Sequence, residues 1–185
     1  RVDDLGGAWL GVSEYTLGER IRALRQDPSA WKLPATNLLM GAFGQFTLAG
    51  VQPKTVLLRM RGSWYDANGT TPTTHIVKTG LPGNPDHALN EHLCLALADA
   101  LGLAAARSEV MTFEEEWAVV IDRHDRTVDT EDEQRWVRVH TEDLCQALGT
   151  PPTNRYQRSG GPSPEQIITL GRQRLRTHRL SPPSG

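Results

Sequence analysis

Short runs of apolar residues, several of them alternating with polar ones, dominate this chain of 185 residues. They are separated by segments rich in Gly, Asn, Pro or charged residues, which is typical of strands joined by turns. Strands are predicted at about 45–49, 54–61, 63–66, 73–78, 107–113 and 117–123. Turns are predicted at 61–63, 67–69 and 114–116, where Gly, Asn or consecutive Glu residues interrupt the apolar pattern.

Three other segments carry apolar residues at helical spacing. The first begins at a predicted capping box, Thr16–Glu19, and its apolar stripe is Leu17, Ile21 and Leu24. The second is predicted for 86–101, between a capping Asp and a terminating Gly, and the third for 142–148. We expect the long helix to turn its apolar residues inward: Leu89, Leu93, Ala96, Leu97, Ala100 and Leu101. The chain therefore alternates strands with helices and predicts an α+β fold.

Changes in composition, and the residues that interrupt predicted helices and strands, divide the chain into four segments. Residues 1–44 form a helix and a connector, 45–125 hold most of the predicted strands, and 126–170 lead into a helical part. Residues 171–185 contain four Arg, no acidic residue and no apolar face, so we interpret them as a disordered or frameshifted tail. The chain opens at Arg1 rather than Met and closes in this tail, so we expect a fragment truncated at both ends.

The bulk composition excludes some classes of function. A net charge of −2 argues against nucleic acid as the main partner, because nucleic-acid-binding domains are usually basic. No apolar run approaches the roughly 20 residues of a membrane-spanning helix, and no signal-peptide pattern is present. Cys94 and Cys145 both lie in helix-like apolar patterns and are expected to be reduced, packed thiols. These features predict a cytoplasmic, globular protein.

Two lysines, each next to a predicted strand, are the main candidates for chemistry. The Ala49–Gly50 pair precedes a polar cluster that ends at Lys54, and Lys78 ends a second strand. A flexible loop with a Lys at its exit suits phosphate binding. It is not a Walker loop, since Pro rather than Gly precedes Lys54 and a strand rather than a helix follows. An ordinary hairpin turn is the alternative interpretation.

In protein kinases, a strand Lys holds the α- and β-phosphates of ATP and pairs with a Glu on the following helix. Glu91 lies on the predicted helix after Lys78 and away from its leucine stripe, so it is the candidate partner. Solvated surface charges are the alternative interpretation of both residues. The polar segment 122–126 ends a strand and is either a nucleotide-contacting hinge or a charged strand end with local ion pairs. Metal binding is not expected there or at 140–143, because neither has a recognised ligand spacing.

Together these segments resemble the HipA family, the serine/threonine kinase toxins of bacterial toxin–antitoxin systems. Order and spacing agree across about 45–170. The segments that carry the resemblance are Thr47–Leu57, Thr71–Lys78, Asn90–Cys94, Leu101–Leu103, Asp122–Arg126, His140–Gly149, Tyr156 and Gly160–Pro162. The resemblance implies a protein-kinase-like small lobe in 45–125, an antiparallel sheet with one main helix, followed in 126–170 by the hinge and the beginning of a helical large lobe.

The resemblance also assigns roles to residues. Lys78 would anchor ATP with Glu91 as its orienting partner, and Asp122 and His124 would lie at the adenine-binding hinge, where the family usually has a Glu and an aromatic residue. Thr47 stands where the family usually has an autophosphorylated Ser. The ATP-binding residues implied are Ala49, Gly50, Val51, Gln52, Lys54, Lys78, Asp122 and His124.

The remaining implications concern the whole protein. In the family a helical lobe supplies the catalytic Asp and the residues that bind Mg²⁺, and this sequence contains neither, so no catalytic or metal-binding residue is assigned. We expect a fragment of a kinase that uses ATP and Mg²⁺ and is inactive alone. Expected partners are a HipB-type DNA-binding antitoxin, with DNA contacted only through it, and a protein substrate such as an aminoacyl-tRNA synthetase. A separately encoded regulatory small lobe, and a nucleic-acid binder that uses the arginine tail, are the alternatives.

Overall fold

The computed structural model divides into two compact units, residues 1–139 and 140–185. It describes residues 8–27, 52–68, 70–81, 83–131 and 135–180. The strand predicted at 45–49, with Thr47 and Ala49, and the first two residues of the phosphate-binding loop expected at 50–54, Gly50 and Val51, lie outside the described residues.

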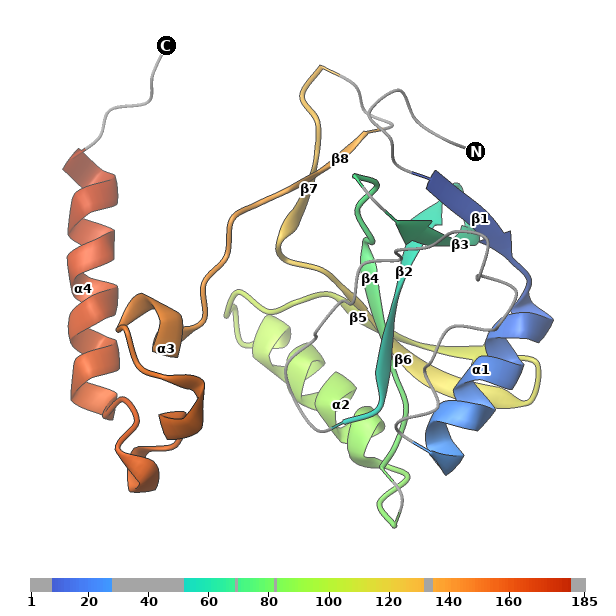
Figure 1. Ribbon diagram of the computed structural model, residues 1–185, viewed down its shortest axis with the longest axis horizontal. Helices are drawn as coiled ribbons and strands as arrows, with labels where there is room; N and C mark the ends of the chain where they lie inside the picture. Colours follow the sequence, from blue (N-terminus) through green and yellow to red (C-terminus); the bar gives the residue numbers. More distant parts are fainter. Residues whose placement is uncertain (1–7, 28–51, 69, 82, 132–134, 181–185) are drawn as a thin grey trace. The chain divides into compact units, whose positions relative to one another are not determined.

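The first unit is built on a six-stranded antiparallel sheet (Figure 1). Its strands are β1 (Ala8–Val12), β2 (Lys54–Met60), β3 (Ser63–Asn68), β4 (His75–Lys78), β5 (Ser108–Phe113) and β6 (Glu116–Asp122). Their order across the sheet is β1-β3-β2-β4-β6-β5. The antiparallel sheet and the strands predicted between 54 and 123 are confirmed.

Strand β1 was not predicted. It pairs with β3, from Ala8 opposite Asn68 to Val12 opposite Trp64, and so lengthens β3 beyond its predicted end. Only Ala8 of β1 is buried, and the strand lies at the sheet edge. An edge strand with so little apolar contact leaves almost no periodic signal in the sequence.

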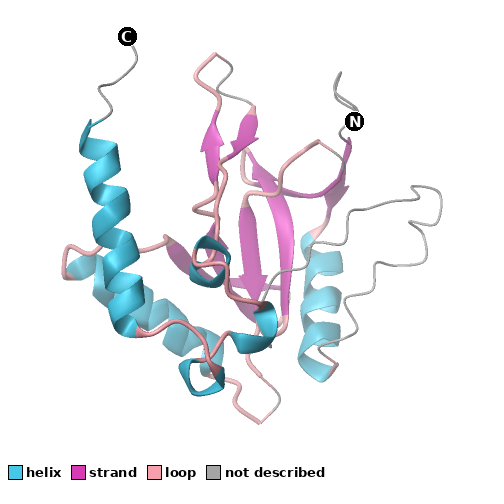
Figure 2. Cartoon of the chain, turned by 60° about the vertical axis from the view of Figure 1, so that its left-hand side comes forward, coloured by secondary structure: helices cyan, strands magenta, loops and turns pink. Residues whose placement is uncertain are grey.

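Helices α1 (Glu14–Gln26) and α2 (His87–Ala100) cover opposite faces of the sheet (Figures 1 and 2). The α1 face holds the larger core, in which Leu17 and Ile21 pack with Leu57, Trp64, Val77, Phe113, Ala118 and Val120. The α2 face holds a smaller cluster in which Ala88 packs with Val119 and Ile121. Successive residues of β4 and β6 therefore point alternately at α1 and at α2, as the pleat of a strand requires.

The first helix begins earlier than the capping box predicted at Thr16–Glu19. Its N-cap is Ser13, whose side-chain oxygen accepts a hydrogen bond from the Thr16 amide at 3.1 Å. Thr16 is thus the third helical residue and not the cap. The predicted apolar stripe is correct, because Leu17, Ile21 and Leu24 are all buried.

The inward face predicted for α2 is wrong. Leu93, Leu97 and Leu101 expose 57%, 60% and 70% of their surface. The helix instead turns Ala88 toward the sheet, with Leu95 packed against the same cluster. Glu91 and His92 lie on that inner side as well, where their polar atoms find partners on the strands. A helix that is apolar on both sides does not reveal from periodicity which side is buried.

The ribbon of β7 (Arg126–Val128) and β8 (Trp136–Arg138) belongs to the first unit, which therefore extends past the predicted boundary at 125. The second unit contains α3 (Leu144–Ala147), the 3-10 helices η2 (Pro152–Asn154) and η3 (Gln157–Ser159), and α4 (Pro164–Leu180). The tail predicted to be disordered from 171 is helical up to Leu180, so that prediction is wrong for 171–180. In the described part of the chain, no helix has the length and apolar character that a membrane span needs.

Two arginines with largely shielded side chains, Arg123 and Arg126, tie the segment after β6 to the loop before β4. Arg123 donates to both oxygens of the Asp125 carboxylate, at 3.0 and 2.7 Å, and to Thr73 Oγ1 at 3.2 Å. Arg126 donates to the Thr73 carbonyl at 2.8 Å and lies 2.8 Å from Asp125 Oδ2. Hydrogen bonding from Arg123, with the charges of both arginines, lowers the pKa of Asp125 to about 2 from its ordinary 3.8. Burial and the charge of Arg123 lower the pKa of Arg126.

We predict that Asp125→Asn lowers the free energy of unfolding by about 1.5 kcal/mol at pH 7, because its pKa is depressed from 3.8 to about 2 and solvent screening reduces the full value of that shift. The contribution is fully present above the unfolded pKa and is lost as the pH falls toward 2. Urea unfolding at pH 7 and pH 3 measures both values. In the control, Asp99→Asn removes the same charge from an exposed position on α2. A difference between the parent and Asp125→Asn that does not shrink at pH 3 would contradict this prediction.

Candidate functional site

Two lysines face each other across neighbouring strands. Lys54 begins β2 and lies directly opposite Lys78, the last residue of β4. The next pair outward is hydrogen-bonded, since the Thr79 amide donates to the Pro53 carbonyl at 3.3 Å. Bonded and non-bonded pairs alternate along an antiparallel ladder, so the two lysines form the non-bonded pair, whose side chains lie closer together. Like charges directly opposite each other destabilise a sheet, and this pair therefore needs compensation.

A carboxylate on α2 provides part of that compensation. Lys78 Nζ donates a hydrogen bond to Glu91 Oε1 at 2.5 Å. Both side chains are largely shielded, with exposures of 17% for Lys78 and 29% for Glu91. The structure thus brings together the two residues that the sequence had singled out as partners. Their role toward a nucleotide stays a prediction.

Burial and two neighbouring charges determine the environment of Lys54. Burial and the neighbouring charge of Lys78 lower the pKa of Lys54, and Glu91 opposes this effect. Both ammonium groups are partly buried. An anion placed between the lysines would relieve their repulsion, and phosphate oxygens are suitable acceptors for such donors.

The segment before Lys54 is fixed against the end of β4. Gln52 Nε2 donates to the carbonyl oxygen of Thr79 at 3.1 Å. Thr79 has no exposed surface, and Pro53 is buried beside it. The sequence had placed Gln52 among the ATP-binding residues, but its described hydrogen bond is to the protein backbone. Thr79 was not singled out, because a Thr at a strand end carries no distinctive signal.

Asp122 lies at the opposite end of β4, where its Cα pairs with that of His75. Its Oδ1 lies 3.1 Å from His75 Nε2, and His75 Nδ1 lies 2.7 Å from Thr74 Oγ1. Thr74 Oγ1 accepts from the Arg59 amide at 2.9 Å and has its hydroxyl hydrogen available to donate to Nδ1. From this network we assign a neutral His75 that donates from Nε2 to Asp122. Burial lowers the pKa of His75 and favours the same state, against the opposing charge of Asp122.

The carboxylate of Asp122 is therefore not directed at the lysines. His75 contacts Trp64 at 5.4 Å between ring centroids, and Trp64 belongs to the α1-side core. Lys78 contacts α2 on the other face. Lys78 pairs with Val119, three residues before Asp122 on β6, a separation of roughly 10 Å along the strand. His124 follows β6, is exposed, and has no hydrogen-bond or ion-pair partner among the described residues.

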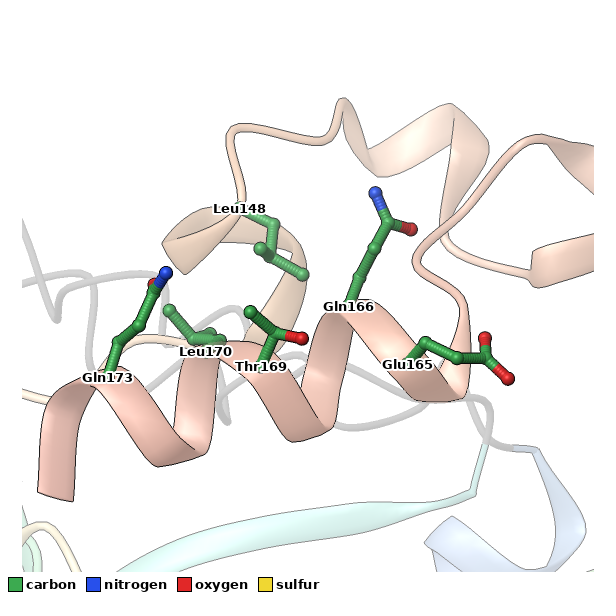
Figure 3. A pocket seen from close by; sticks show the side chains of 6 residues that line it. All are labelled: Leu148, Glu165, Gln166, Thr169, Leu170 and Gln173. Atoms are coloured by element: carbon green, nitrogen blue, oxygen red, sulfur yellow. The ribbon is translucent and has the colours of Figure 1, made fainter.

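A separate hollow of about 350 Å³ lies in the second unit, between α3 and α4 (Figure 3). The residues that line it are Leu148, Glu165, Gln166, Thr169, Leu170 and Gln173. This lining has one carboxylate and no basic residue, so it lacks the donors that a phosphate group requires. The lysine pair with Glu91 is the better candidate for a functional site.

A model of the HipA-like C-terminal domain matches residues 46–181. The chain belongs to the HipA family. The resemblance inferred from the sequence is thereby confirmed. The match includes residues 171–181 and gives no support to a frameshift in that segment.

Relatives within the HipA family include proteins named as kinases. Over 142 residues the chain is 35% identical to Y4mE of Sinorhizobium fredii, whose name assigns it provisionally to the kinases; the match covers 76% of this chain and 33% of the relative. It is 32% identical over 136 residues to the serine/threonine-protein kinase toxin HipA of Shewanella oneidensis, covering 74% of this chain and 30% of the toxin.

A solved structure, the complex of HipA, HipB and operator DNA from Shewanella oneidensis MR-1, contains a similar chain with a TM-score of 0.61 and 26% identity. The match covers 91% of this chain and 37% of that one. The chain thus spans about a third of the length of the HipA-family proteins that it matches.

We predict that Gly80→Ala disrupts the connection between β4 and α2. A Cβ at residue 80 would lie 2.1 Å from the Pro85 carbonyl oxygen, so the loop that sets Glu91 against Lys78 would have to move. We expect a loss of about 2 kcal/mol or more in the free energy of unfolding, measured by urea titration. Gly11→Ala is the matched control, because its Cβ would meet only Tyr65 Cε1 at 3.9 Å. Equal losses in the two variants would contradict the prediction.

Proposed function

We propose that this chain forms the ATP-binding part of a HipA-type serine/threonine protein kinase, which transfers the γ-phosphate of ATP to a protein hydroxyl. The observation that carries the proposal is the hydrogen bond of Lys78 to Glu91 beside the opposing Lys54. In protein kinases a strand Lys paired with a Glu on the following helix holds the α- and β-phosphates. The names of the relatives support the same interpretation.

The charges of the site suit a polyphosphate. Glu91 orients the ammonium of Lys78 and leaves its remaining donors for phosphate oxygens. Lys54, whose pKa is lowered by burial and by Lys78, regains a favourable environment when an anion lies between the two strands. Residues 49–51, which the family resemblance assigns to ATP binding, would add backbone amides to the phosphates.

The adenine would lie toward the other end of β4 and β6, roughly 10 Å from the lysines. Because the carboxylate of Asp122 is engaged by His75, we assign its contribution to the backbone rather than to the side chain. His124 has no partner among the described residues, so its backbone and its ring are both available to a base.

The chemical step is proposed for the whole protein and not for this chain. Among the described residues, no three His, Cys, Asp or Glu side chains are grouped to hold a metal ion. Mg²⁺ would supply charge neutralisation on the phosphates when bound, and we assign no residue of this chain to it. Phosphoryl transfer also needs a residue that orients the acceptor hydroxyl, and the family resemblance places that residue outside this sequence.

We also propose that the complete protein is held by a HipB-type antitoxin and meets DNA only through it. The solved complex of the similar chain with HipB and operator DNA supports this partner. The protein substrate, for which an aminoacyl-tRNA synthetase is our candidate, rests on the family resemblance alone.

We predict that Lys78→Ala weakens ATP binding at least tenfold, because it removes the cation that would hold the α- and β-phosphates. Glu91→Gln should have a smaller effect in the same direction, since the ammonium remains but loses its charged partner. Isothermal titration of the chain with ATP measures both.

Arg135→Ala is the matched control. It removes one cation of an ion pair with Asp129 in the same unit, at the loop end of the β7–β8 ribbon. Circular dichroism checks that each variant is folded. If Lys78→Ala and Arg135→Ala bind ATP equally well, the proposed site is wrong.

A further inference from the structure

The pairing of β2 and β4 continues one residue beyond both strands, at Pro53 and Thr79. On one side of this pair the Thr79 amide donates to the Pro53 carbonyl at 3.3 Å. A hydrogen-bonded antiparallel pair normally exchanges two such bonds. The second would run from the amide of residue 53 to the carbonyl of residue 79. Proline has no amide hydrogen, so the second bond cannot form from the backbone here.

The side chain of the preceding residue supplies that donor. Gln52 Nε2 donates to the Thr79 carbonyl oxygen at 3.1 Å, the acceptor that the missing amide would have used. Thr79 is completely buried, so without Gln52 its carbonyl would lose this donor with no solvent to replace it. The pair at 53 and 79 therefore keeps two hydrogen bonds, one from the main chain and one from a side chain.

We propose that Gln52 is a positioning residue whose side-chain amide replaces the missing N–H of Pro53 and so fixes Lys54 opposite Lys78. The effect of Gln52 on ATP binding rests on the proposed function of the lysine pair. Gln52 acts on the nucleotide through the spacing of the two strands, and its amide is engaged by the Thr79 carbonyl instead of by phosphate.

The hydrogen bond from Gln52 to the Thr79 carbonyl matters because the two neighbouring lysines repel each other. Lys54 and Lys78 are the pair immediately inside Pro53 and Thr79 and tend to push the strand ends apart. The two bonds at the outer pair oppose that separation. Loss of one of them should fray the end of the sheet and widen the space between the ammonium groups.

The first test compares Gln52→Met, which keeps the length of the side chain but removes the donor, with Gln26→Met at the exposed end of α1. We expect Gln52→Met to lower the folded-to-unfolded ratio about fivefold and to speed hydrogen exchange of the Thr79 amide. ATP affinity should fall severalfold. Gln26→Met should change none of these quantities.

The second test is a rescue by Pro53→Ala, which restores a backbone amide at residue 53. We expect Gln52→Met to cost about fivefold in the folded-to-unfolded ratio when Pro53 is present and less than twofold when it is combined with Pro53→Ala. In the double variant the new amide at residue 53 should exchange slowly. If Gln52→Met fails to fold, recovery of folded protein in the double variant supports the proposal.

Three results would overturn the proposal. They are a Gln52→Met variant that matches its control, an undiminished loss in the Pro53→Ala background, and a rapidly exchanging amide at residue 53 in the double variant. Stability and hydrogen exchange are measured without nucleotide, so they test the role of Gln52 even if the chain binds no ATP. Failure of the ATP site would instead appear in the parent chain and in Lys78→Ala.

Discussion

Strand β4 is only four residues long, yet the rest of the first unit depends on its pairing. It hydrogen-bonds to β2 on one side and to β6 on the other. Its alternating side chains reach both layers: Val77 enters the core under α1, and Lys78 meets α2. Such a short strand has little freedom to slip, because a shift of one residue would exchange the buried valine for a lysine. The positions of Lys54, Lys78 and His75 all follow from that single register.

Polar groups, and not only apolar packing, determine how α2 meets the sheet. The side of the helix with exposed leucines is the more hydrophobic, but the side that faces the strands carries Glu91 and His92. Glu91 reaches Lys78 on β4, and His92 Nδ1 lies 2.9 Å from Ser108 Oγ on β5. Rotating the helix to bury its leucines would break the contacts with the partly buried Lys78 and Ser108. These two contacts therefore fix the rotation of the helix about its axis.

Local signals were sufficient to predict the strands after residue 54, the core stripe of α1, and the pairing of Lys78 with Glu91. They failed where the decisive contact is distant in sequence. Strand β1 exists because β3 offers it a partner, and residues 171–180 are helical although their composition suggests disorder. The inner face of α2 depends on residues of two strands, and the bond of His75 to Asp122 depends on the register of β4 against β6. No pattern within a single segment carries that information.

Lys54 and Lys78 lie directly opposite each other, an arrangement of like charges that disfavours pairing of their strands. If the proposed function is correct, an anion site is kept at the expense of this repulsion, which is a common balance between function and stability. The stability of such a protein would then depend on the anions in the surrounding solution. A multivalent anion that binds only the folded chain will raise the melting temperature in proportion to the logarithm of its concentration above the dissociation constant. Under the proposed function, the choice of buffer anion therefore changes the measured stability of the protein.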